Sequence, residues 1–377
     1  MNVLDSKTHD MCIGCGACES ACPLELINIG SDEAGFYKAQ INDTDKCVGC
    51  GKCTYVCPVN NEPEGSRKTA HYGCAREKDI RKAGTSGGVF TAIAKEFEKS
   101  GGVVFGAILD LDKELVYHTS SKECDISRMS KSKYVQSNTS GVFGRIKDLL
   151  DNNEKVLFCG TPCQVNGLLR MLGKKYDNLL TVDFVCHGVP SPAFFKDYLD
   201  DLKRKNKRKV LKEYDFRSKD DGWGKIRVSY KFNEKKTVKN GMHDVYNTLF
   251  EKGISVNPAC YECLYRINHS SDITIGDFWR YRQVGLSAES VKDGITLCVV
   301  NTQKGTDVLK SNPYLDITDI KLKYSDYAFV QRKKTSSSSV EFYGDYVANG
   351  YNYVKKKYAG NLYIRSVFSK IKSILRK

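Results

Sequence analysis

The chain has 377 residues, of which 41% are hydrophobic and 28% are charged, and its formal net charge is +14. This length is enough for two or three domains of ordinary globular composition. No run of eighteen apolar residues could span a bilayer, and acids occupy positions 5, 10 and 19 where a secretory signal would be basic and then apolar. We therefore expect a cytoplasmic protein without membrane-spanning segments.

The sixteen cysteines and the positive charge restrict the class of protein further. In a long chain without a secretion signal, so many cysteines indicate metal binding or catalysis rather than disulfides. The charge fits a solvated surface or attraction of an anionic partner, such as an acidic ferredoxin. No stacking aromatics or recognition helix accompany the basic residues, so we expect no nucleic-acid partner.

The first sixty residues contain one short unit twice, as Cys-Ile-Gly-Cys-Gly-Ala-Cys at 12–18 before Cys22-Pro23 and Cys-Val-Gly-Cys-Gly-Lys-Cys at 47–53 before Cys57-Pro58. This is the bacterial ferredoxin spacing, in which the fourth cysteine of one run ligates the cluster of the other run. Zinc sites usually use two pairs of ligands, which this pattern lacks. The repeat predicts two [4Fe–4S] clusters, one held by Cys12, Cys15, Cys18 and Cys57, the other by Cys22, Cys47, Cys50 and Cys53.

Beyond the repeat, a polar stretch at 59–70 with Pro and Gly is typical of a linker. Helical segments then alternate with apolar runs, beginning with a helix at 88–99 and a strand at 103–109. The further runs at 156–159, 180–186, 273–276 and 297–301 predict buried strands, whereas 225–232 alternates like a half-exposed antiparallel strand. The sequence thus predicts a small ferredoxin-like dicluster domain followed by a mixed-sheet α/β domain. The basic run 203–209 is expected to be solvated.

The last 28 residues contain eight Lys or Arg and no acid. Helical periodicity places an apolar stripe on one face, formed by Ile364, Val367, Phe368, Ile371, Ile374 and Leu375. This stripe fits packing against the protein's own core, docking to a partner protein, or contact with an anionic membrane surface. The last alternative would place the protein at the inner face of the membrane.

Four of the remaining cysteines, Cys163, Cys186, Cys260 and Cys263, lie in loop-like settings near strand ends. Four such thiolates favour a third iron–sulfur cluster, with zinc or unligated thiols as alternatives. The other four are expected to be ordinary buried thiols: Cys74, Cys124, Cys159 and Cys298. His187 is expected to be structural, with metal binding or proton donation as alternatives.

Five motifs follow one another in the α/β part: Thr85-Ser-Gly-Gly-Val-Phe-Thr, Ser132-Lys-Tyr-Val-Gln-Ser, Gly160-Thr-Pro-Cys-Gln, Cys186-His-Gly-Val-Pro-Ser-Pro and Asp272-Ile-Thr-Ile-Gly-Asp-Phe-Trp. Over residues 70–315 they resemble the beta subunits of deazaflavin-coenzyme (F-420) hydrogenases and dehydrogenases. The resemblance implies a bound FAD and one [4Fe–4S] cluster in this part, in agreement with the third cluster expected from the cysteines. It also raises the coenzyme F-420 itself as a cofactor, although no residue demands it.

Candidate FAD residues come from these motifs. A glycine-rich turn at a helix start, here Ser86-Gly87-Gly88, suits the FAD diphosphate, with a plain helix cap as the alternative. The other candidates are Lys133, Gln136, Thr161 and Asp277, and Trp279 is placed to close the flavin site or to pack on a strand. No acid–base set is recognisable, so the catalytic residues stay unassigned.

We therefore expect an iron–sulfur flavoprotein oxidoreductase that passes electrons between a ferredoxin-like carrier and FAD, reducing or oxidising a small organic substrate. Members fused to a dicluster domain resemble those of surface-polysaccharide gene sets. The alternatives are a non-catalytic electron-transfer subunit of a hydrogenase or dehydrogenase complex, and a cluster-bearing regulatory or scaffold protein. The expected domains are the ferredoxin domain at 1–64, the two parts of the beta-subunit-like domain at 65–150 and 151–320, the latter with FAD and the third cluster, and a basic tail at 321–377.

Overall fold

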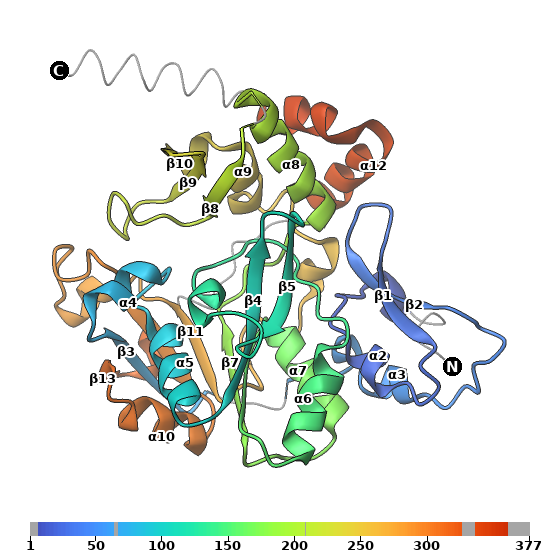
Figure 1. Ribbon diagram of the computed structural model, residues 1–377, viewed down its shortest axis with the longest axis horizontal. Coiled ribbons are helices and arrows are strands. Elements are labelled where there is room, and N and C mark those ends of the chain that lie inside the picture. The colour runs from blue at the N-terminus through green and yellow to red at the C-terminus, as the bar shows by residue number, and fades with distance from the viewer. Residues whose placement is uncertain (1–6, 64–66, 208, 326–335, 361–377) are drawn as a thin grey trace.

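The computed structural model describes residues 7–63, 67–207, 209–325 and 336–360. Its N-terminal part, blue in Figure 1, is an antiparallel pair of strands, β1 (Ile27–Ser31) and β2 (Tyr37–Ile41), with short helices beside it. These helices are α1 (Lys7–Asp10), α2 (Ala17–Ala21), α3 (Lys52–Tyr55) and the 3-10 turn η1 (Pro58–Asn60). Gly16 (φ 81°) and Gly51 (φ 74°) adopt left-handed backbone at the starts of α2 and α3, so each cysteine loop turns directly into a helix.

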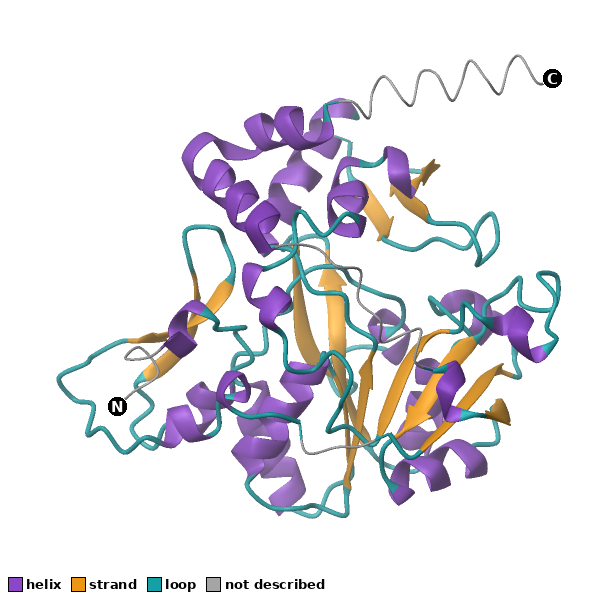
Figure 2. Ribbon diagram, turned by 180° about the vertical axis from the view of Figure 1, so that it is seen from behind, coloured by secondary structure: helices purple, strands orange, loops and turns teal. Residues whose placement is uncertain are grey.

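A mixed sheet forms the centre of the molecule (Figure 2). Across the sheet its strands are β13 (Leu315–Ile320), β3 (Thr69–Ala75), β12 (Thr296–Val300), β11 (Ile273–Asp277), β7 (Leu179–Phe184), β6 (Val156–Cys159), β4 (Val103–Asp110) and β5 (Leu115–Ser120). The run β11-β7-β6-β4 is parallel, and the outer pairings are antiparallel. The predicted mixed α/β fold is therefore confirmed. The ends of β11, β7 and β6 share one edge of the sheet.

Helices cover both faces of this sheet. One face packs against α5 (Val89–Lys99) and α10 (Gln303–Ser311), with α4 (Lys78–Ala83) beside α5. The other face packs against α6 (Val142–Asp151) and α7 (Pro162–Leu172). The dicluster domain joins this second face, because Cys15, Ala17 and Val56 belong to the same apolar cluster as α6 and α7. Helix α5 and the central strands lie where the sequence predicts them, whereas β3, β5 and β13 were not predicted.

A separate lobe lies above the carboxyl edge of the sheet in Figure 1. It contains a three-stranded antiparallel sheet, β8 (Leu211–Asp215), β9 (Arg227–Phe232) and β10 (Lys235–Asn240), and the helices α8 (Pro192–Lys205), α9 (Val245–Glu251) and α12 (Ser336–Ala359). Aromatic side chains of α8, α9 and α12, such as Phe194, Tyr246 and Phe342, form its core. The alternating segment 225–232 is thus antiparallel, as predicted, but belongs to this lobe.

Part of the predicted basic tail belongs to this lobe as well, since α12 packs against α8 and α9. The apolar stripe predicted at 364–375 lies outside the described residues. No helix in the described ranges has the length and apolar character needed to cross a membrane.

Candidate iron–sulfur and flavin sites

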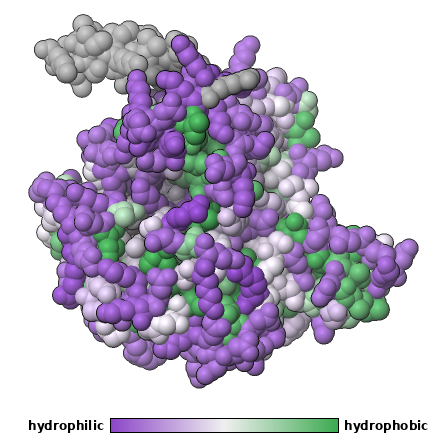
Figure 3. Space-filling view, in the orientation of Figure 1, coloured by the Kyte–Doolittle hydropathy of each residue, from purple (hydrophilic) through white to green (hydrophobic). Residues whose placement is uncertain are grey.

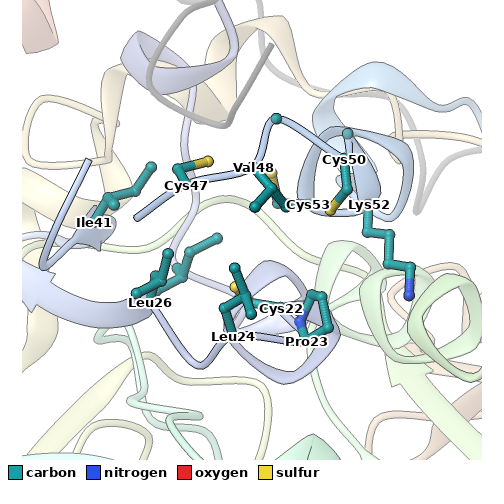
Figure 4. Close-up of a pocket in the computed structure, with 13 residues that line it drawn as sticks. Cys22, Pro23, Leu24, Leu26, Ile41, Cys47, Val48, Cys50, Lys52 and Cys53 are labelled. Atoms are coloured by element: carbon teal, nitrogen blue, oxygen red, sulfur yellow. The ribbon is translucent and has the colours of Figure 1, made fainter. Parts of the chain in front are cut away.

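The dicluster domain brings eight cysteines into two groups. The outer group consists of Cys22, Cys47, Cys50 and Cys53, which line one pocket. Figure 4 shows Cys22, from the end of α2, opposite the loop that carries the other three. Leu24 and Val48 line the same cavity and are 46% and 72% exposed, so the outer group lies at an open, apolar tip.

The inner group consists of Cys12, Cys15, Cys18 and Cys57, which line a second pocket and are all buried. Burial and the neighbouring thiols raise the pKa of Cys15 and Cys18 well above the ordinary value, and burial raises that of Cys57 to about 11. Such thiols keep their protons until a metal displaces them. Each cavity takes three cysteines from one run and the fourth from the other, which is the crossed arrangement that the spacing predicts.

A third group forms at the carboxyl edge of the large sheet. Cys163 lies in the first turn of α7, Cys186 follows β7, and Cys260 and Cys263 lie in and just after the 3-10 turn η4 (Pro258–Glu262). Burial raises the pKa of all four thiols, and their mutual proximity raises those of Cys163, Cys186 and Cys260 further. The structure therefore brings together the four outlying cysteines that their sequence settings single out.

Two backbone N–H groups donate hydrogen bonds to sulfur atoms of the third cysteine group. The N–H of Gly188 donates to Cys186 Sγ at 3.4 Å, and that of Tyr265 donates to Cys263 Sγ at 3.3 Å. Such N–H···S bonds tune cluster potentials in iron–sulfur proteins. Among the described residues, no three His, Cys, Asp or Glu side chains converge closely enough to hold a single metal ion. Four thiols in one place are a donor set that a [4Fe–4S] cluster or a zinc ion could use, and the third cluster stays a prediction.

Tyr265 lies between the inner and third groups. Its hydroxyl is 2.8 Å from Pro58 O and 2.7 Å from Asn61 O in the dicluster domain, and 2.9 Å from Asn166 Oδ1 on α7. Burial, followed by thiols of both groups, raises its pKa. On α7, a Cβ at Gly167 would approach Cys15 Sγ to 3.0 Å. Gly167 is four residues after Cys163, about 6 Å along the helix, so the two groups are close neighbours.

The first flavin motif forms the predicted turn at the start of α5, with Gly88 (φ 79°) as its cap. Ser86 Oγ donates to Ile295 O at 2.6 Å, and Gly87 N–H donates to Thr296 Oγ1 at 2.7 Å. These two polar groups fasten the turn to the start of β12. Ser86, Gly87 and Gly88 as FAD-binding residues stay a prediction.

The other candidates lie at the same edge of the sheet but have different local roles. Lys133 is half-buried and donates to Arg128 O and Ser130 O, and its desolvation lowers its pKa to about 7. Thr161 caps α7 in a capping box with Gln164. Asp277 ends β11 and accepts hydrogen bonds from Arg217 Nη1 at 3.2 Å and Trp223 Nε1 at 3.0 Å.

Gln136 has a different setting, because its side chain holds the dicluster domain. Its Oε1 accepts from Tyr37 N–H at 2.7 Å, while its Nε2 donates to Ile13 O at 2.9 Å and Tyr37 O at 3.1 Å. Only 3% of the residue is exposed. A role for Gln136 at a flavin stays a prediction, whereas its contacts with the first domain are direct.

Two further residues of this edge, Arg217 and Lys219 in the loop between β8 and β9, were not predicted from the sequence. Lys219 Nζ donates to the carbonyls of Arg81, Ser86 and Asp293, which joins this loop to the Ser86 turn, and burial lowers its pKa to about 8. A charged Arg-Ser-Lys segment followed by Asp-Asp-Gly is typical of an exposed turn. No local signal in the sequence indicates that Arg217 is buried and Lys219 half-buried.

The paired cysteine cavities beside a mixed α/β sheet define an iron–sulfur protein of electron transfer. Comparison with known proteins agrees, because residues 11–61 match the 4Fe–4S dicluster domain. Residues 153–323 match the family described as the C terminus of the coenzyme F420 hydrogenase/dehydrogenase beta subunit. Over residues 153–323 the chain is therefore similar to this beta-subunit family, and residues 11–61 form an N-terminal dicluster domain.

Other comparisons are more distant. A chain of the F420-reducing [NiFe] hydrogenase complex from Methanosarcina barkeri is 15% identical, with a TM-score of 0.46, and the match covers 74% of this chain and 92% of that one. No curated protein matches.

Replacement of Gln136 tests the attachment of the dicluster domain. In Gln136→Leu, the polar backbone groups of Tyr37 and Ile13 lose their partners, and we expect a loss of roughly 2–4 kcal/mol of stability. The measurement is the urea midpoint of unfolding, which should fall. Gln40→Leu is the matched control, because the side chain of Gln40 makes an exposed hydrogen bond to Ser31 O and its loss should change stability by less than about 0.5 kcal/mol. Equal midpoints for the two variants would contradict the role of Gln136.

Proposed function

We propose that the chain is a flavin-dependent oxidoreductase that passes electrons between an external ferredoxin-like carrier and a small organic substrate. The observation that supports this most is the order of the cysteine groups. The outer group lies at an open tip, the inner group adjoins it within the dicluster domain, and the third group follows across Tyr265. This order suits a path for electrons from the surface to the carboxyl edge of the sheet.

The chain's residues fit these cofactors in different ways. Twelve thiols in three groups of four suit three [4Fe–4S] clusters, with Cys22 and Cys57 crossing between the two runs. The Ser86 turn, Lys133 and Asp277 are the residues we propose for FAD. When bound, the clusters supply one-electron transfer. A flavin accepts electrons one at a time from clusters and transfers two of them to a substrate as a hydride. The protein's own part is to bury the thiols, to fix the distance between groups, and to orient the flavin.

The sheet edge brings the flavin motifs to one place. Lys219 joins the Ser86 turn, and Arg217 joins Asp277 of the last motif and contacts Tyr134 of the second. Three motifs that are far apart in the sequence thus meet around one loop. This convergence supports a common ligand there.

We propose that the substrate belongs to surface-polysaccharide metabolism, because the dicluster domain is fused to the beta-subunit-like part. Coenzyme F-420 is the alternative to this substrate as the two-electron partner of the flavin. A second candidate function is that of an electron-transfer subunit that needs a catalytic partner, because the family name describes a subunit. Turnover by the isolated chain with reduced viologen as donor would favour the first function. Cluster reduction without turnover would favour the second.

The net charge of the dicluster domain affects which external electron carrier can bind to it. Residues 11–61 contain six acidic and three basic side chains, so the positive charge of the whole chain lies elsewhere. Figure 3 shows apolar surface on this domain, at the right, and exposed Leu24 and Val48 lie beside the outer group. A carrier that approaches the outer group therefore meets an apolar rim rather than a basic patch. The acidic domain is itself docked against the basic remainder of the chain.

Cluster and flavin content test the proposal directly. Anaerobically purified protein should contain about twelve iron atoms and one flavin per chain, whereas two clusters would give about eight iron atoms. Cys18→Ser should remove about four iron atoms and leave the flavin, and Cys260→Ser should remove about four from the third group. The control is Cys124→Ser, since Cys124 belongs to none of the groups. Eight iron atoms, unchanged in Cys260→Ser, would overturn the third cluster, and absence of flavin would overturn the catalytic function.

A charge at the apolar rim tests the entry point. In Val48→Glu, a carboxylate would be desolvated under a docked carrier, so the second-order rate of reduction by a reduced two-cluster ferredoxin should fall roughly tenfold. Stopped-flow absorbance measures this rate. Reduction by dithionite should be unchanged, because it needs no docking. Val210→Glu is the control, as Val210 is 60% exposed but lies in the distant lobe. Equal slowing by both variants would place the entry elsewhere.

A further inference from the structure

One buried cation at the sheet edge lacks a full set of partners. The side chain of Arg217 is 7% exposed, and its Nη1 donates to Asp277 Oδ2. Its Nη2 is buried and has no hydrogen-bond partner among the described residues. A buried guanidinium N–H without an acceptor is unfavourable, the more so because the group is charged. Such a group in a folded protein calls for an acceptor from outside the chain.

The surroundings of Arg217 indicate where that acceptor would lie. The guanidinium carbon is 5.1 Å from the ring centroid of Trp279, and Trp279 stacks on Trp223 with centroids 4.5 Å apart. Trp223 is 2% exposed and is held by Asp277, whereas Trp279 is 40% exposed. The two indoles and Arg217 thus form a platform that opens to solvent at Trp279.

The charged groups around this platform already have other partners, so they do not supply the acceptor that Nη2 lacks. Asp277 divides its two oxygens between Arg217 and Trp223, so it is already fully engaged. Lys219 donates to three neutral carbonyls, and the charges of Asp277 and Asp293 act on it. Lys131 is paired with Asp215 at 2.7 Å. Glu251 and Tyr134 also act on Arg217, yet Nη2 still lacks a hydrogen-bond acceptor among the described residues, beside the Ser86 turn that Lys219 holds.

We infer that Arg217 and the Trp223–Trp279 stack form a binding site for a ligand that carries a carboxylate or phosphate group. An anionic oxygen accepts the hydrogen bond of Nη2, and a flat part of the ligand lies against Trp279. The inference rests on the proposed function, because it supplies the substrate class or the cofactor contact of that same site. The anion belongs either to an acidic substrate or to the FAD diphosphate.

The chain offers a direct reporter for this site, since Trp223 and Trp279 are its only two tryptophans. Titration of the full-length protein with inorganic pyrophosphate, and separately with succinate, should give a saturable change in tryptophan fluorescence for at least one of the two. In Arg217→Gln that response should weaken roughly 10- to 100-fold. The control Arg282→Gln removes an exposed arginine nearby and should respond like the wild type. No saturable response in the wild type, or equal responses in wild type and Arg217→Gln, would overturn the inference.

A second variant guards against a folding defect, because Gln removes the charge opposite Asp277. Arg217→Lys retains this charge but lacks the second nitrogen, so it should fold and still lose most of the anion response. An unchanged response in a folded Arg217→Lys protein would overturn the role of Nη2. Iron content and circular dichroism establish that each variant is folded.

Flavin binding separates the two sources of the anion. If the anion is the FAD diphosphate, Arg217→Lys should weaken FAD binding at least tenfold and leave riboflavin binding unchanged, because riboflavin has no phosphate. If the anion belongs to the substrate, FAD binding should be unchanged while the response to succinate or pyrophosphate is lost. A wild-type protein that binds FAD but shows no anion response refutes this inference alone. A protein that binds no flavin refutes the proposed function.

Discussion

The close packing of the dicluster domain on helix α7 is the constraint on which the proposed electron path depends. Cys15 lies against Gly167, where any side chain would meet its sulfur, and Cys163 begins the same helix one turn earlier. One rigid helix therefore fixes the separation of the inner and third groups. Tyr265 adds hydrogen bonds to both sides of the same junction. A glycine at 167 is thus required by close approach rather than by backbone conformation.

The stability of this junction is linked to the metal sites. The dicluster domain has a small apolar core of its own, in which Cys12, Cys18 and Cys53 take part beside Ile27 and Ala39. A domain of this size buries little apolar surface, and metal binding commonly supplies part of its folding free energy. Cluster binding, folding of the domain and its attachment through Gln136 are then coupled, so a cluster variant can also alter docking.

The sequence predicted what is encoded locally and missed what arises only in three dimensions. The crossed cysteine groups follow from spacing alone, and the central strands from apolar runs, because both signals lie within a few residues. Gln136 was assigned to a flavin from its motif, yet its amide bonds Tyr37, 99 residues away in the chain. Arg217 and Lys219 had the pattern of a solvated turn, and only the contact between the lobe and the sheet edge buries them. Residues whose role depends on domain docking carry no periodicity that could reveal it.

The dicluster domain and the rest of the chain differ in net charge, and this difference affects how an external electron carrier would bind. Residues 11–61 carry six acidic and three basic side chains, whereas the rest of the chain is net basic. The exposed tip of the dicluster domain is apolar at Leu24 and Val48. Association there would depend on apolar contact, which salt screens little, whereas steering by the net charge would act on the other faces. In the proposed function, the fusion would make transfer from the dicluster domain to the rest of the chain intramolecular, and only the exchange at the outer group would depend on diffusion and docking.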